Sequence, residues 1–240
     1  MSLDNLKKVI KESDNIVFFG GAGVSTESNI PDFRSASGLY NEKTQSKYSP
    51  EEILSHDFFM EHTEEFYDFY KSKMIYVDAK PNDAHLVLAE LEKMGKLKAV
   101  ITQNIDGLHQ SAGSKEVLEL HGSVHRNYCT KCHKFFGLDY IIKSKGIPLC
   151  EECGGIIKPD VVLYGENLDM DVLHRSIDYI AKSQVLIVAG TSLTVYPAAG
   201  LIRYFKGKEL ILINKTPTPY DKLAHIVIND SVGKTLRNVL

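Results

Sequence analysis

Short apolar runs alternate along this chain with longer segments that mix apolar and polar residues behind a capping residue. The short runs predict buried strands and the longer segments predict helices. Predicted strands are Ile16–Phe19, Ala99–Thr102, Val117–Leu120, Val185–Ala189 and Leu210–Ile213, and predicted helices are Pro81–Met94 and Asp169–Ala181. This alternation favours a doubly wound α/β domain with a parallel sheet.

Two segments interrupt the alternation. Tyr48–Tyr76 has a helical pattern rich in aromatic residues, and Tyr128–Gly155 contains all four cysteines. Strand signals resume after each segment, so both are predicted to be insertions into the sheet domain. The predicted division is a helical module at residues 41–78, a cysteine module at 124–158, and a sheet domain made of 1–40, 79–123 and 159–240.

Composition narrows the class of protein. The chain has 240 residues and a formal net charge of -3, which provides no basic face for nucleic acid. No apolar run approaches the roughly 18 residues of a membrane span, and the N-terminal segment lacks the apolar centre of a signal peptide. We therefore expect a cytoplasmic protein that binds neither membranes nor nucleic acid directly.

A glycine-rich turn follows the first predicted strand. Gly20-Gly21-Ala22-Gly23 leads into a Ser/Thr-rich segment that can begin a helix. Glycines at such a turn let backbone N–H groups approach a phosphate. The spacing differs from GxGxxG, and Gly-Ala-Gly alone is as often a tight turn. Nearby, Ile30–Arg34 joins an acid, an aromatic residue and a base behind a proline.

Polar residues also follow later strands, where a parallel sheet binds its ligands. Thr102–Asp106 offers amides and a carboxylate suited to a carboxamide or a ribose, or to a helix cap. Gly190–Ser192 can bind phosphate or simply turn the chain. His121 has the ordinary pKa of a general base, although a lone histidine is usually a structural residue. The short apolar pattern of Val161–Glu166 predicts a core or edge strand, and an unpaired edge strand could bind an extended peptide.

The cysteines form two CxxC pairs separated by residues 133–149. This spacing is typical of a four-cysteine zinc ribbon, and four sulfurs leave no open position, so the zinc is predicted to be structural. Free thiols or a redox pair are the alternatives. His125 and His133 lie nearby and are expected to be surface residues. The predicted ligands are Cys129, Cys132, Cys150 and Cys153.

Taken in order, these motifs resemble those of the sirtuins, NAD-dependent protein deacylases, over nearly the whole chain from Asn15 to Asn214. The shared motifs are GAG, IPDFR, TQNID, LHG, the paired CxxC, YGE and GTS. The resemblance, to a sirtuin of bacterial or archaeal type, implies a Rossmann-like domain and a small domain made of a zinc ribbon and a helical module. It also implies that NAD and an acetyl-lysine peptide bind in the cleft between them.

The resemblance assigns roles residue by residue. His121 would be the catalytic base, and Asn104 would act with it. The predicted NAD contacts are Gly21, Ala22, Gly23, Thr26, Phe33, Arg34, Gln103, Ile105, Asp106, Gly190, Thr191, Ser192, Asn214 and Ser231, and the predicted peptide contacts are Val162, Tyr164 and Gly165.

The implied activity is transfer of the acetyl group from acetyl-lysine to ADP-ribose, with release of nicotinamide and O-acetyl-ADP-ribose. A deacylase of other acyl groups, a protein ADP-ribosyltransferase and a non-catalytic NAD-responsive binding module are the alternatives. A zinc-ribbon nucleic-acid module on a Rossmann scaffold is disfavoured by the charge.

The chain departs from the usual sirtuin pattern at four positions. Gly20 replaces the usual threonine, and Asn29 and Ser35 each replace a usual glycine. These three replacements lie in the loop that the resemblance assigns to NAD, so they bear on NAD affinity. Sirtuins that prefer succinyl- or malonyl-lysine resemble Tyr-x-x-Arg in this stretch, and that arginine pairs with the acyl carboxylate. This chain has Tyr70 in place of the arginine. This difference predicts a preference for uncharged acyl groups.

Overall fold

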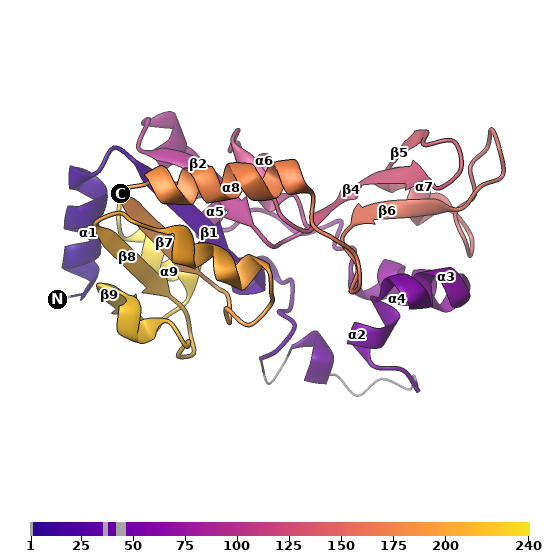
Figure 1. Ribbon diagram of the computed structural model, residues 1–240, viewed down its shortest axis with the longest axis horizontal. Coiled ribbons are helices and arrows are strands. Elements are labelled where there is room, and N and C mark those ends of the chain that lie inside the picture. Colours follow the sequence, from indigo (N-terminus) through magenta and orange to yellow (C-terminus); the bar gives the residue numbers. More distant parts are fainter. Residues whose placement is uncertain (1, 36–37, 42–46) are drawn as a thin grey trace.

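The computed structural model describes residues 2–35, 38–41 and 47–240. Residues 42–46 of the predicted helical module, and residues 1 and 36–37 of the predicted sheet domain, lie outside the described residues. The described chain forms a large parallel sheet flanked by helices at one end of the molecule, and two smaller modules at the other end (Figure 1). No helix within the described ranges is both long and apolar enough to cross a membrane.

The large sheet has six strands in the order β3-β2-β1-β7-β8-β9, and every neighbouring pair is parallel. This order is that of a Rossmann-like doubly wound sheet, with its switch point beside β1, and it confirms the predicted fold class. The strands are β1 (Ile16–Gly20), β2 (Leu97–Thr102), β3 (Val117–Glu119), β7 (Val185–Ala189), β8 (Glu209–Ile213) and β9 (Ile226–Ile228).

Helices cover both faces of this sheet because its strands are apolar on both sides. In β1, Ile16 and Phe18 join one buried cluster, while Val17 and Phe19 join another. The first cluster includes residues of α1 (Ser2–Glu12), α5 (Asp83–Lys93) and α9 (Val232–Arg237), and the second those of α8 (Met170–Lys182) and the 3-10 segment Ala198–Tyr204. The short helix α6 (Leu108–Ala112) lies between β2 and β3 in sequence.

The helices begin where the sequence provides caps. The Asn82 side chain accepts a hydrogen bond from the backbone of α5, and the Asp169 carboxylate accepts two from the first turn of α8.

The two inserted segments share one core. One segment forms a three-stranded antiparallel sheet in the order β5-β4-β6, with the cysteines at the end of β4 and in the connections between the strands. The other segment forms a group of short helices. Aromatic residues of the helices and apolar residues of the sheet form a single third cluster. The elements are β4 (Gly122–Cys129), β5 (Phe135–Gly137), α7 (Leu138–Lys143) and β6 (Ile157–Val161) in the zinc-ribbon module, and α2 (Pro50–Ile53), α3 (His56–Glu61) and α4 (Thr63–Lys73) in the helical module.

Two local predictions differ from the structure. The segment after β1 forms two 3-10 turns, Ala22–Val24 and Thr26–Ser28, instead of an α-helix. The Val24 carbonyl accepts a hydrogen bond from the Asn82 side chain, and Asn29 takes a left-handed conformation, so no helical ladder continues. Strand β6 ends at Val161 instead of continuing to Glu166. Beyond it the Val162 amide donates to the His121 carbonyl, and Tyr164 forms an isolated bridge with Ser55.

Candidate active site between the two domains

A cavity of about 1200 Å³ opens at the carboxyl edge of the large sheet, between the Rossmann-like domain and the two smaller modules. It collects residues from segments far apart in sequence, as expected at a topological switch point. All the predicted catalytic, NAD and peptide residues line it: Gly21, Ala22, Gly23, Thr26, Phe33, Arg34, Gln103, Asn104, Ile105, Asp106, His121, Val162, Tyr164, Gly165, Gly190, Thr191, Ser192, Asn214 and Ser231.

A buried hydroxyl joins two of the predicted residues. The Ser25 Oγ donates to Asp106 Oδ2 at 2.7 Å and accepts from Asn104 Nδ2 at 3.0 Å. Asp106 Oδ1 also accepts from the Leu108 amide at 2.9 Å. These bonds fix the orientation of the Asn104 amide and the Asp106 carboxylate. Ser25 was not predicted as a site residue, although it is the first hydroxyl residue after the GAG turn, two positions beyond Gly23.

The His121 ring is held by a backbone carbonyl. Its Nδ1 lies 3.0 Å from the Gln103 oxygen. A carbonyl only accepts, so Nδ1 carries the proton and Nε2 is left as the basic nitrogen. Burial lowers the pKa of His121 below 6.5, with the Gln103 bond opposing it, so the ring is neutral at pH 7. A neutral imidazole with one free nitrogen is suited to general-base catalysis.

The glycines at the head of the site pack two loops together. The amide of Gly21 donates to the Ala189 carbonyl at 3.2 Å, and that of Gly23 donates to the Gly190 carbonyl at 2.8 Å. A Cβ at Gly23 would lie 2.7 Å from the Gly190 Cα. These two amides are therefore used within the protein, and the glycines are required for close approach of the loops.

The segment containing Phe33 and Arg34 folds over the cavity. The Phe33 ring lies 5.4 Å from the Tyr40 ring, and the Arg34 guanidinium lies 5.3 Å above Tyr40. The Tyr40 hydroxyl in turn lies 2.6 Å from that of Tyr164. Tyr40, which the sequence analysis did not single out, thus connects this segment to the predicted peptide-binding loop.

Two of the departures in this loop fit their backbone. Asn29 has φ 62°, a left-handed conformation that asparagine tolerates better than most residues after glycine. A Cβ at Gly20 would lie 2.7 Å from a ring carbon of Phe18, so a threonine there would displace that ring. Ser35 is exposed and lines the cavity.

Tyr70 lies outside the cavity lining. Its side chain is fully buried and stacks on Phe66 at 5.5 Å, and within the described ranges its hydroxyl has no hydrogen-bond partner. Residues one turn further along, Lys73 and Met74, line the cavity instead. Tyr70 therefore belongs to the core of the helical module, and an acyl group would not contact its side chain in this arrangement.

The four cysteines converge as predicted. All four sulfurs lie within 4.8 Å of one another, with Cys129 and Cys153 at 3.4 Å and Cys132 and Cys150 at 3.6 Å. Tetrahedral zinc with Zn–S bonds of about 2.3 Å places its sulfurs about 3.8 Å apart, so the set fits a structural zinc. His125 and His133 are exposed, as expected, and the cluster does not include them.

Comparison with known proteins agrees with this geometry. A family model described as the Sir2 family matches residues 21–197. An NAD-dependent protein deacetylase of Clostridium tetani is 66% identical over 237 residues, covering 98% of this chain and 96% of that protein. One from Clostridium perfringens is 62% identical over 239 residues, covering 99% and 98%.

Solved structures give the same result. A structure of Sir2 with a p53 peptide and NAD+ has a TM-score of 0.86 and 42% identity, covering 100% of this chain and 97% of that one. Sir2 bound to an acetylated peptide has a TM-score of 0.86 and 41% identity, with the same coverage. The matching family model, the high identity to these deacetylases and the shared fold show that this chain belongs to the Sir2 family, the sirtuins.

Proposed function

We propose that this protein is an NAD-dependent lysine deacetylase that transfers the acetyl group of acetyl-lysine to ADP-ribose. The observation that carries the proposal is the free Nε2 of a neutral His121 in the same cavity as the Asn104–Ser25–Asp106 cluster. The deacetylase names of its relatives support the same activity. The products are the peptide with its lysine deacetylated, nicotinamide and O-acetyl-ADP-ribose, and one water molecule is consumed.

The proposed NAD contacts lie on both sides of the sheet's switch point. When bound, NAD supplies the ribose carbon that loses nicotinamide and accepts the acetyl oxygen. Asp106 and the Ile105 backbone would orient the carboxamide, and Phe33 would exclude water from the reacting carbon. The Gln103 side chain donates to Thr191 Oγ1 at 3.1 Å, which ties the ribose-binding side of the site to the phosphate-binding side.

His121 would accept a proton from a ribose hydroxyl through Nε2. Its Nδ1–H bond to Gln103 holds the ring in the tautomer that this step requires. Its own carbonyl accepts from the Val162 amide at 3.0 Å, so the base is linked to the proposed peptide-binding loop.

An acetyl-lysine peptide would bind as an extended strand beside Val162 and Gly165. The backbone of Tyr164 is already bonded, to the Leu54 carbonyl and the His56 amide, both at 2.9 Å. Tyr164 would therefore contact the peptide with its side chain. The domain boundaries given above, the cytoplasmic location and the absence of direct nucleic-acid binding stay predictions.

We also propose a preference for uncharged acyl groups. Among the described residues that line the cavity, Arg34 is the single arginine, and it stacks on Tyr40. Acetyl-lysine peptides should be turned over much faster than succinyl-lysine peptides. An equal or higher kcat/KM for succinyl-lysine would contradict this preference without affecting the assignment of His121.

The decisive experiment follows acetyl-lysine peptides by mass spectrometry, with and without NAD. His121→Ala should lower deacetylation by roughly 10²- to 10⁴-fold and retain nicotinamide exchange better than product formation. Asp106→Asn should lower both, because Asp106 acts at the carboxamide.

The matched control is His174→Ala, which alters an exposed histidine on α8. It should leave both activities unchanged. A folded His121→Ala variant with near-normal deacetylation would refute the assignment. Transfer of ADP-ribose to protein without deacetylation would favour the alternative transferase, and NAD binding without turnover would favour a binding module.

A further inference from the structure

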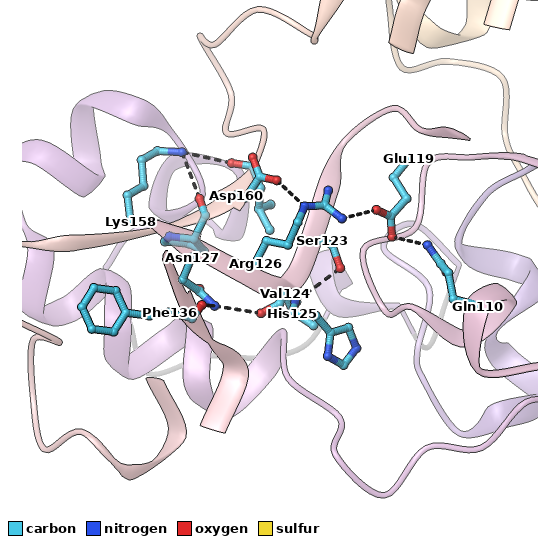
Figure 2. A network of polar contacts seen from close by, with 12 residues as sticks. Gln110, Glu119, Ser123, Val124, His125, Arg126, Asn127, Phe136, Lys158 and Asp160 are labelled. Carbon is cyan, nitrogen blue, oxygen red and sulfur yellow. Dashed lines mark hydrogen bonds and ion pairs between the residues drawn. The ribbon is translucent and has the colours of Figure 1, made fainter. Parts of the chain in front are cut away.

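A chain of charged side chains crosses the junction between the two domains. The Arg126 guanidinium on β4 donates from Nη1 to Glu119 Oε2 at 2.6 Å and from Nε to Asp160 Oδ2 at 2.7 Å. Gln110 on α6 donates to the other oxygen of Glu119 at 2.8 Å. Figure 2 shows Arg126 between these two carboxylates. Glu119 on β3 and Gln110 on α6 belong to the Rossmann-like domain. Arg126 on β4 and Asp160 on β6 belong to the three-stranded sheet, whose strands begin before residue 124 and end after residue 158, outside the bounds predicted for the zinc-ribbon module.

This contact spans a gap in the backbone pairing of β4. Gly122 and Ser123 pair with β6, and pairing resumes only at Asn127, so residues 124–126 form a bulge. Within this bulge, β4 is not paired with β6 through its backbone, although Arg126 still pairs with Gly137 of β5. The Arg126–Asp160 ion pair connects the bulged segment to β6 through side chains.

The bulge contacts the active-site loop directly. The Val124 amide donates to the Ile105 carbonyl at 3.0 Å, and His125 Nε2 lies 3.1 Å from the Asp106 carbonyl. A Cβ at Gly107 would lie 2.7 Å from the His125 ring, so loop and bulge are in close contact. His121 lies in the same stretch of chain, between Glu119 and the bulge. Arg126 therefore holds both ends of the segment that carries the base.

We propose that Arg126 is a positioning residue for the reaction, which fixes the bulge of β4 and through it the Ile105–Asp106 loop and His121. Arg126 does not line the cavity and contacts no reacting group. Its planar fork suits this role, because it reaches two carboxylates on different domains at once, which a lysine cannot do equally well. The proposal rests on the deacetylase function proposed above.

The test compares Arg126→Gln with Arg175→Gln. Arg175 also pairs with a glutamate at the β3 edge, Glu116, but both partners belong to the Rossmann-like domain. Arg126→Gln should lower kcat for deacetylation by roughly 10- to 100-fold, the size of effect that a displacement of about 1 Å produces. The KM values for NAD and peptide should change by less than about threefold, because the binding residues themselves are intact. Arg175→Gln should behave as the unaltered protein.

Three further variants separate positioning from general destabilisation. Arg126→Lys should recover part of the lost kcat, because it restores the charge but not the fork. Combining Arg126→Gln with Glu119→Gln should cost little more than Arg126→Gln alone, since both remove one interaction. Asp160→Asn leaves the Arg126–Glu119 pair intact and should lower kcat with the fold preserved, so it decides the matter if Arg126→Gln fails to fold.

The outcomes are distinguishable. An unaltered protein with no deacetylase activity would contradict the proposed function, whatever Arg126 does. An active protein in which Arg126→Gln or a folded Asp160→Asn keeps the kcat of Arg175→Gln would overturn the positioning role. Additive losses for the double variant, or equal losses in kcat for Arg126→Gln and Arg175→Gln, would also overturn it.

Discussion

The Rossmann-like domain and the small domain are held together by different means. The large sheet buries aliphatic side chains on both faces, so adjacent residues such as Val17 and Phe18 serve separate cores. The small domain has one core, built around stacked aromatic rings such as Phe66 and Tyr70, and its sheet is short and bulged. The large sheet is covered on both sides by apolar clusters, whereas the loops that hold the cysteines lie at the edge of the single core of the small domain, so we expect a metal to matter more for the small domain.

Their buried polar groups differ as well. The large domain buries two histidines, His85 and His109, whose rings lie 4.7 Å apart. Both nitrogens of His109 and Nε2 of His85 have no partner in the described structure. The small domain instead buries the Tyr70 hydroxyl and Asn127 Oδ1, neither of which has a partner among the residues that the structure describes. The two regions are therefore expected to respond to different perturbations.

The largest effect is expected from removing the metal. Cys150→Ala leaves three thiolates and should unfold the small domain, abolishing deacetylation while the large sheet keeps its secondary structure. Zinc content by elemental analysis and near-ultraviolet circular dichroism measure this. His133→Asn is the control, because the position is exposed with φ 58° and asparagine accepts that conformation. Stoichiometric zinc in folded Cys150→Ala, or its absence from the unaltered protein, would contradict the structural role.

The aromatic core offers the next test. Tyr70→Arg buries an unpaired guanidinium and should destabilise the small domain by about 3–5 kcal/mol. Tyr70→Phe removes only the unpartnered hydroxyl and should leave the free energy of unfolding unchanged or slightly raised. Urea unfolding monitored by tyrosine fluorescence measures both. A stable Tyr70→Arg variant with improved succinyl-lysine turnover would show that this position faces the substrate after all.

Acid should weaken the large domain specifically. Burial lowers the pKa of His85 to about 4, and burial together with His85 lowers that of His109 to about 3, against about 6.5 in the unfolded chain. The unfolded state then binds more protons, so the contribution of each histidine is complete above pH 6.5 and is lost as the pH falls. Below that pH the free energy of unfolding should fall by up to about 1.4 kcal/mol per pH unit for each histidine.

The control for this pH dependence uses two leucine variants. His109→Leu should reduce the slope of the unfolding free energy with pH, because one of the buried histidines with a lowered pKa is removed. His174→Leu, which alters an exposed residue, should leave it unchanged. The same slope in His109→Leu as in the unaltered protein would show that His109 is already accessible to protons in the folded state.

The smallest effect is expected where the proposed NAD-binding loop contacts the proposed peptide-binding loop, at Tyr40 and Tyr164. Tyr40→Phe removes the 2.6 Å bond to Tyr164 but keeps the ring contacts with Phe33. The loss of one such bond, about 1 kcal/mol, should raise KM for NAD by roughly 3- to 10-fold without changing the fold. Steady-state kinetics at saturating peptide measures it, and a KM within error of the unaltered protein would show that the bond does not hold the loop.

The strands of the large sheet were predictable because apolar runs such as Val185–Ala189 are short, buried on both faces and flanked by polar residues. The helical module was predicted only as one segment with a helical pattern, and not as separate helices. Short helices depend on capping residues such as Ser49 and Ser55 and on tertiary packing more than on periodicity. The 3-10 turns after β1 were not predicted, because the Asn82 side chain that interrupts the helix comes from a distant segment.

The sequence by itself indicated the family, the four clustered cysteines and the motif residues that line the cavity, because each depends on residue types at fixed spacings within short motifs. The tertiary structure alone decided how the candidate site residues are held: the Ser25 hydroxyl between Asn104 and Asp106, the Nδ1 of His121 against the Gln103 carbonyl, and the burial of Tyr70. It also decided that Arg126 joins the two domains. Hydrogen bonds and ion pairs between distant segments depend on distances of a few tenths of an ångström, and these exist only once the chain has folded.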